Sequence, residues 1–229
     1  MISRIQHWFG NGWMGIVDLL MTAFCVFLSL SIHEFAHGLA AYKLGDNTAK
    51  YMGRLNLSPA SHLDPIGAIC LFLFGFGWAK PVPVNPNNFK PGKRKSGMVI
   101  TSLAGPLSNL LVAFVALLLL RIIERFLGGT SYVAVMLVTI IVIMLSNLIS
   151  MNIGLALFNL MPVPPLDGSK ILNAALPSRI YFKIMQYEQY GFIILILLLN
   201  LPIFNSFLNM LASWILRFYD LVIGLIPFL

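Results

Sequence analysis

The sequence predicts an all-α multi-pass membrane protein of about five to six transmembrane helices, with a small membrane-associated β-hairpin or re-entrant region. Of the 229 residues, 59% are hydrophobic and only 10% are charged, whereas a soluble domain carries about 25% charged residues. Apolar stretches of about 20 residues, the length that spans a bilayer, follow one another along the chain. The basic residues behind the net charge of +7 lie mostly between these stretches, which indicates membrane-surface loops and no nucleic-acid partner.

We expect residues 1–229 to form a single integral membrane domain, because the sequence contains no linker, low-complexity tract or short repeat. Cys25 and Cys70 lie in apolar surroundings and do not form a disulfide framework. The N-terminal segment lacks the features of a cleaved signal peptide. Any regulatory domain would then come from a separate partner in the membrane.

The first helix is predicted at 14–43, followed by a re-entrant or β region at 51–90. Within that region, residues 66–78 are apolar but too few for a comfortable span. Residues 80–86 read Lys-Pro-Val-Pro-Val-Asn-Pro, and their prolines favour an extended conformation over a helix.

The second span is predicted at 98–123, and its small residues near the start permit close helix packing. A third helix segment, 132–168, ends in a proline-rich break. The C-terminal helices cover 190–229, as spans at about 190–204 and 207–229. Arg217 and Asp220 in the last span are three apart and could pair on one helix face near an interface.

The stretch His33-Glu34-Phe35-Ala36-His37 is an H-E-x-x-H motif inside an apolar segment. Residues four apart share a helix face, so His33 and His37 can hold one zinc ion. Glu34 beside the metal can act as the general base on an attacking water. Two histidines on the polar face of an ordinary helix fit poorly here, because ionisable groups within an apolar span are costly.

Catalytic zinc needs a third protein ligand and an open position. Asp167 is the candidate, because the first and third helices run in the same direction and end on the same side of the membrane. The alternative is a turn aspartate before Gly168. Asn159 is a second candidate catalytic residue, whose amide would stabilise an oxyanion, although it could simply cap its helix.

A second polar cluster contains His62 and Asp64. Both residue types can bind metals, but in such a cluster they more often cap a turn or hold a loop over a site. We therefore do not include them among the predicted ligands.

The distribution of basic residues predicts the orientation. Residues 43–95 contain eight Lys or Arg and residues 167–189 contain three, whereas the opposite loop begins with only Arg121 and Arg125. Loops rich in Lys and Arg stay in the cytoplasm. We expect a multi-pass protein of the cell membrane, with the active site toward the cytoplasmic side.

These motifs resemble those of the site-2 proteases, a family of intramembrane zinc metalloproteases. The matching stretches lie between Ser31 and Lys170, and residues 62–89 resemble the family's membrane-associated β-hairpin region. The resemblance implies zinc bound by two histidines and an aspartate, a glutamate base, and an asparagine near the oxyanion. It also implies membrane-anchored regulators as substrates, such as anti-sigma factors. The sequence departs from larger members of the family in lacking a PDZ insert or a CBS domain, so we expect a compact form. The residues that carry these roles are His33, His37 and Asp167 for the metal, and Glu34 and Asn159 for catalysis.

We therefore predict a zinc-dependent endopeptidase that cuts peptide bonds in or near transmembrane segments. Its expected cofactor is one Zn²⁺ per chain, and its expected partners are the lipid bilayer and a membrane-anchored protein substrate. A metal transporter or metal sensor would use the same ligands without needing Glu34 as a base. An inactive scaffold that binds transmembrane helices is a third alternative, which the intact motif disfavours.

Overall fold

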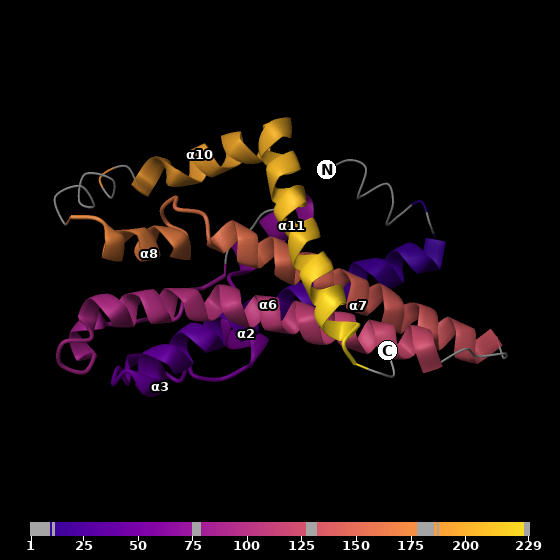
Figure 1. Ribbon diagram of the computed structural model, residues 1–229, viewed down its shortest axis with the longest axis horizontal. Helices are drawn as coiled ribbons and strands as arrows, with labels where there is room; N and C mark the ends of the chain where they lie inside the picture. Colours follow the sequence, from indigo (N-terminus) through magenta and orange to yellow (C-terminus); the bar gives the residue numbers. More distant parts are fainter. Residues whose placement is uncertain are drawn as a thin grey trace.

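The computed structural model describes residues 10, 12–74, 79–126, 132–177, 186 and 188–226. In this part of the chain the structure is helical, as predicted, and β pairing is limited to one isolated antiparallel bridge between Leu63 and Ala79. The helices, shown in Figure 1, are α2 (Gly12–Lys43), α3 (Thr48–Tyr51), α4 (Pro59–His62), α5 (Pro65–Phe74), η1 (Pro86–Asn88), α6 (Arg94–Phe126), α7 (Tyr132–Asn159), α8 (Asp167–Ala175), α10 (Glu188–Leu199) and α11 (Pro202–Ile223).

Four helices of the described residues are long and apolar enough to cross a membrane: α2, α6, residues 135–159 of α7, and α11. This confirms that the chain is a membrane protein. The span predicted at 190–204 corresponds to α10, which has 12 residues and is therefore only about 18 Å long. The predicted count of five to six spans is thus not confirmed.

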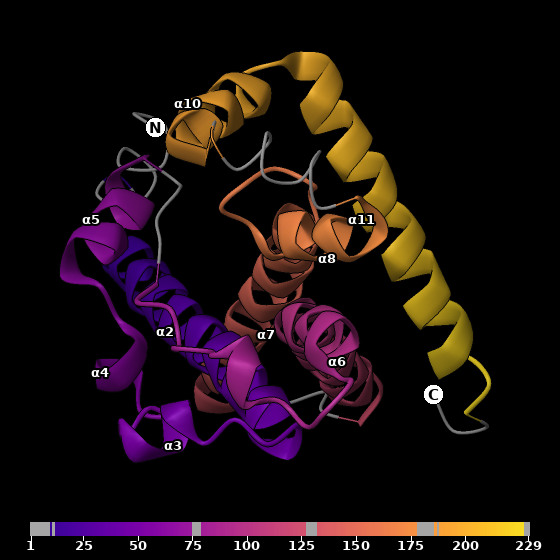
Figure 2. The ribbon, with the colours of Figure 1, turned by 90° about the vertical axis from the view of Figure 1, so that its left-hand side faces the viewer.

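The centre of the fold is a bundle of α2, α6 and α7, which lie side by side in both ribbon views (Figures 1 and 2). Small buried side chains, including Cys25, Ala113 and Ala116, allow these helices to approach closely. Larger residues of α7, such as Leu145 and Ile149, fill the remaining space. The bundle therefore holds the C-terminal end of α2 against the N-terminal half of α6.

The C-terminal helix α11 crosses the bundle obliquely (Figure 1) and is attached to it near its own C-terminal end. The hydroxyl of Tyr219 donates to the carbonyl of Leu110 over 2.8 Å. Asp220 pairs with Arg121 of α6 at 3.0 Å, and not with Arg217, the partner that the sequence suggested. The N-terminal half of α11 is largely exposed; Ile203, for example, is 79% exposed.

The segment between α2 and α6 wraps around the end of α2 that carries the H-E-x-x-H motif (Figure 2). It contains α3, α4 and α5, and then an extended run, residues 80–85, which we call the strap. The strap is held at both ends: Lys80 N–H donates to the His62 carbonyl at 2.8 Å, and Asn85 N–H donates to Asp46 at 2.7 Å. The predicted β-hairpin is not confirmed, and residues 75–78 lie outside the described part of the chain.

Candidate metal centre

Helix α2 presents His33, Glu34 and His37 toward the interior of the bundle. Their exposed fractions are 5%, 9% and 8%, so all three are buried. The Nε2 atoms of His33 and His37 lie 3.0 Å apart, because residues four apart stack on one helix face. The two imidazoles therefore converge on one point, as the motif predicted.

Asp167 reaches this point from the start of α8. The prolines after Asn159 end α7, and the chain turns before α8 begins at Asp167. Gly168 is required at the turn, because a side chain there would collide with the carbonyl oxygens of Leu160 and Met161. The Oδ2 atom of Asp167 then lies 3.2 Å from His33 Nε2 and 2.9 Å from His37 Nε2.

These three atoms fit a metal. Ligand atoms about 2.0–2.2 Å from a tetrahedral zinc ion lie about 3.3 Å apart, close to the separations of 2.9–3.2 Å between the two Nε2 atoms and Asp167 Oδ2. They are also the one group of three metal-type ligands in the described residues. Two histidines and a carboxylate are typical ligands of catalytic zinc.

Lys170 supports the carboxylate of Asp167. Its Nζ lies 3.0 Å from Oδ1, one helical turn along α8, so Oδ2 is left to face the histidines. Burial would raise the pKa of Asp167, but the bonds to His33 and His37 and the charge of Lys170 outweigh it and hold the pKa well below its usual range. The carboxylate is therefore ionised, as a metal ligand must be.

Helix α6 covers the histidines with backbone. A Cβ on Gly105 would lie 2.6 Å from Cε1 of His33 and would also collide with His37, so only glycine fits there. One turn earlier, the carbonyl of Thr101 lies 2.6 Å from Nδ1 of His37. A carbonyl only accepts, so Nδ1 carries the proton and Nε2 of His37 is free to bind a metal.

Glu34 is held by the strap. The backbone N–H of Val82 donates to Oε2 of Glu34 over 2.8 Å, and Val82 itself is 8% exposed. The second carboxylate oxygen, Oε1, makes no hydrogen bond within the described residues. Glu34 is therefore oriented without being one of the three converging ligands.

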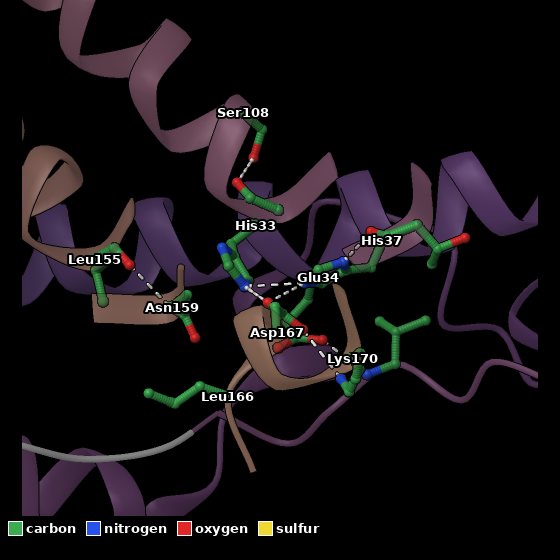
Figure 3. Close-up of polar contacts among 12 residues, drawn as sticks. His33, Glu34, His37, Ser108, Leu155, Asn159, Leu166, Asp167 and Lys170 are labelled. Carbon is green, nitrogen blue, oxygen red and sulfur yellow. Dashed lines mark hydrogen bonds and ion pairs between the residues drawn. The ribbon is translucent and has the colours of Figure 1, made fainter. Parts of the chain in front are cut away.

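The remaining candidates lie elsewhere. The amide nitrogen of Asn159 donates to the Leu155 carbonyl at 3.0 Å, back along its own helix (Figure 3); a role at the oxyanion stays a prediction. His62 is fully buried, with Nε2 2.7 Å from the Asn56 carbonyl. Asp64 accepts from the backbone N–H of Gly67 at the start of α5. Both hold loop structure, which was the alternative to metal binding.

The sequence did not reveal four of the contacts around the site, those made by Val82, Thr101, Gly105 and Lys170. Two of them come from backbone atoms, which any residue type supplies. Gly105 stands out in the sequence because it precedes Pro106 inside a predicted helix, but this pattern indicated only close helix packing and no contact with the histidines. Lys170 lies one turn after Asp167, a spacing that could have suggested the ion pair.

Comparison with known proteins agrees with this geometry. The model of Peptidase family M50 matches residues 21–200. The chain is 43% identical over 176 residues to "Putative zinc metalloprotease YwhC" of Bacillus subtilis, covering 77% of this chain and 78% of that protein. It is 28% identical over 201 residues to "Putative zinc metalloprotease Rip2" of Mycolicibacterium smegmatis, covering 83% of this chain and 71% of that protein. No solved structure matches the chain significantly.

Proposed function

Because the chain belongs to peptidase family M50, the site-2 protease family, we propose that it is an intramembrane zinc endopeptidase that cuts membrane-anchored proteins in or near their transmembrane segments. The observation that carries this proposal is the convergence of His33, His37 and Asp167 beside Glu34 in helices of membrane-spanning length. The relatives' names support the metalloprotease activity and the metal, zinc.

The ligands would be Nε2 of His33, Nε2 of His37 and Oδ2 of Asp167. When bound, zinc supplies Lewis-acid chemistry, which polarises a peptide carbonyl and lowers the pKa of a water molecule. Glu34 then serves as general base: Oε2 is occupied by Val82 N–H, and Oε1 takes the proton of the attacking water and passes it to the leaving amine. Rotation of the Asn159 amide away from Leu155 would allow it to donate to the developing oxyanion.

The position of the site along α2 supports cleavage within the membrane. His33 and His37 lie in the C-terminal third of a 32-residue apolar helix, and α6 covers them from its N-terminal half. A substrate helix must unwind locally to expose a carbonyl there, so helix-breaking residues in the substrate would help. The loops at this end carry most of the basic residues, which supports a cytoplasmic opening.

The test is cleavage of a membrane-anchored model substrate by the purified chain in liposomes. We expect wild type to cut in or beside the transmembrane segment, as mapped by mass spectrometry. Glu34→Gln should bind zinc normally and lose at least about 10² to 10⁴-fold in rate. Cleavage by Glu34→Gln at the wild-type rate would contradict the mechanism, and zinc uptake into liposomes by both proteins would favour a transporter instead.

A further inference from the structure

The interface of α2, α6 and α7 contains buried polar atoms that have no hydrogen-bond partner. Among the described residues these atoms are Nδ1 of His33, Oγ1 of Thr101, both amide atoms of Asn109 and Oδ1 of Asn152. Asn109 and Asn152 are completely buried. Orphaned polar groups are costly in any protein interior, and most buried ones are paired with protein or with ordered water. Five such atoms in one interface therefore need an explanation.

The contacts of α6 with α2 show the order of these residues along the helices. Gly105 of α6 lies against the rings of His33 and His37, and Thr101 bonds His37, so α6 runs antiparallel to α2. Asn109 is one turn beyond Gly105 on the same face of α6. This turn brings it level with the part of α2 that precedes His33.

Asn152 reaches the same level from α7. Its amide nitrogen donates to the hydroxyl of Ser29 over 2.8 Å and to the Leu148 carbonyl. Ser29 is one turn before His33 on the same face of α2. A layer formed by Ser29, Asn109 and Asn152 therefore adjoins His33 in the interior of the bundle, one turn toward the N-terminus of α2.

The two histidines differ in how their second nitrogen is supported. Nδ1 of His37 bonds the carbonyl of Thr101, whereas Nδ1 of His33 has no partner in the described part of the chain. In Figure 3 this nitrogen lies on the side of the ring turned away from Asp167. Metal-binding histidines almost always donate their second N–H to an acceptor, which fixes the tautomer. The unpaired acceptors in the adjoining layer are the Oδ1 atoms of Asn109 and Asn152.

We propose that this interface holds a buried water molecule, bound by Asn109 and Asn152, which accepts a hydrogen bond from Nδ1–H of His33. Buried waters typically make about three hydrogen bonds to groups that are otherwise unsatisfied, and these side chains offer that number. Asn109 is then a positioning residue: through the water it keeps Nε2 of His33 deprotonated and directed at the metal. This inference rests on the zinc site proposed above.

The test measures zinc affinity of the purified protein by competition with a chelator. Asn109→Leu removes the polar group, and we expect zinc to bind about 10 to 100-fold more weakly, as is typical when a partner of a ligating histidine is removed. Asn109→Asp keeps an acceptor of the same shape and should restore affinity to near the wild-type value. Asn147→Leu is the matched control, because Asn147 bonds Asp18 and Thr22 elsewhere in the interface and its loss should leave zinc affinity unchanged.

A second readout separates positioning from packing. If Asn109 is merely a poorly satisfied core residue, Asn109→Leu will raise the melting temperature and leave zinc affinity at the wild-type value, which would overturn the inference. We expect instead that Asn109→Leu binds zinc more weakly and that, with Co²⁺ in place of zinc, its visible absorption spectrum is shifted from that of wild type. Should Asn109→Leu fail to fold, Asn152→Leu removes the other acceptor of the water and must show the same loss.

The two proposals fail differently. If wild type binds no zinc, the metal site itself is wrong and this inference falls with it. If wild type binds zinc but does not cut peptides, the proposed protease function fails while the comparison of Asn109 variants remains valid. If wild type and Asn109→Leu bind zinc equally well, only the role of Asn109 is refuted.

Discussion

Val82 and Glu34 are joined by a 2.8 Å hydrogen bond from the backbone N–H of the first to Oε2 of the second. The bond couples the strap, residues 80–85, to the proposed general base 48 residues earlier. The strap is in turn fixed by Arg54, which donates to the carbonyl of Lys80 at 2.7 Å, and by Asp46. The orientation of Glu34 therefore depends on a loop that contributes no side chain to the metal centre.

Val82→Pro should reduce the rate of peptide cleavage while leaving zinc affinity unchanged. Proline has no N–H, and a hydrogen bond to a charged group contributes about 1.5–3 kcal/mol, which corresponds to about 10 to 150-fold in kcat. Val84→Pro is the control, because the Val84 N–H makes no hydrogen bond within the described residues. Equal losses in both variants would assign the effect to distortion of the strap, and not to Glu34.

Gly105→Ala should weaken metal binding. The added Cβ would lie 2.6 Å from Cε1 of His33 and would also collide with His37, so the two imidazoles would have to move apart. We expect zinc affinity to fall at least about 10-fold, because mutating a residue that only orients a metal ligand already lowers metal affinity by that much. Gly154→Ala in α7 is the matched control: its Cβ meets nothing within 4 Å, and it should stabilise the helix by about 0.5–1 kcal/mol.

Asp167→Ala should lose zinc, whereas His62→Ala should keep it. Asp167 Oδ2 contacts both histidines, while His62 bonds a loop carbonyl. Metal analysis of the two purified variants is the measurement. Zinc loss in His62→Ala together with retention in Asp167→Ala would reverse the ligand assignment.

Much of the geometry of the candidate site could be predicted from the sequence because the residues that converge there follow strong local rules. Helical spacing brings His33 and His37 together whatever surrounds them, and helix direction brings Asp167 to the same end of the bundle. Membrane-length apolar segments likewise predicted α2, α6 and α7. These features depend on spacing and composition, which a sequence displays directly.

Other features could not be predicted, because they depend on which backbone atoms meet. The bond between Thr101 and His37 and the bond between Val82 and Glu34 use main-chain groups that carry no sequence signal. The C-terminal region was also difficult to predict. The short helix α10 has the apolar composition of a membrane span, and the partner of Asp220 lies on α6, 99 residues away in the sequence. Spacing within one helix favoured Arg217 as that partner.

Asp46→Asn should destabilise the protein in a pH-dependent manner. Burial would raise the pKa of Asp46, but donors from Thr48, Asn85 and Asn88 outweigh it and hold the pKa below its usual range. The stabilisation is therefore complete above the unfolded pKa of about 3.9 and is lost as the pH falls through the folded pKa. We expect Asp46→Asn to lower the free energy of unfolding by about 1.5–3 kcal/mol at pH 7. In thermal unfolding scans the difference from wild type should shrink below about pH 4, and a difference that is independent of pH would contradict the ionised network.

The last prediction concerns the side of the membrane on which the metal centre opens. Helix α6 has 33 residues and is therefore about 50 Å long, so its two ends should lie on opposite sides of a bilayer. Lys93 precedes its N-terminal end, which is the end closer to the metal centre, and Phe126 at its other end is 64% exposed. In a background without Cys25 and Cys70, we expect Phe126→Cys to react with a membrane-impermeant thiol reagent in intact cells. Lys93→Cys should react only after the cells are permeabilised, because loops rich in Lys and Arg stay in the cytoplasm. Labelling of Lys93→Cys alone in intact cells would place the metal centre toward the outside and would exclude release of a cytoplasmic fragment by this route.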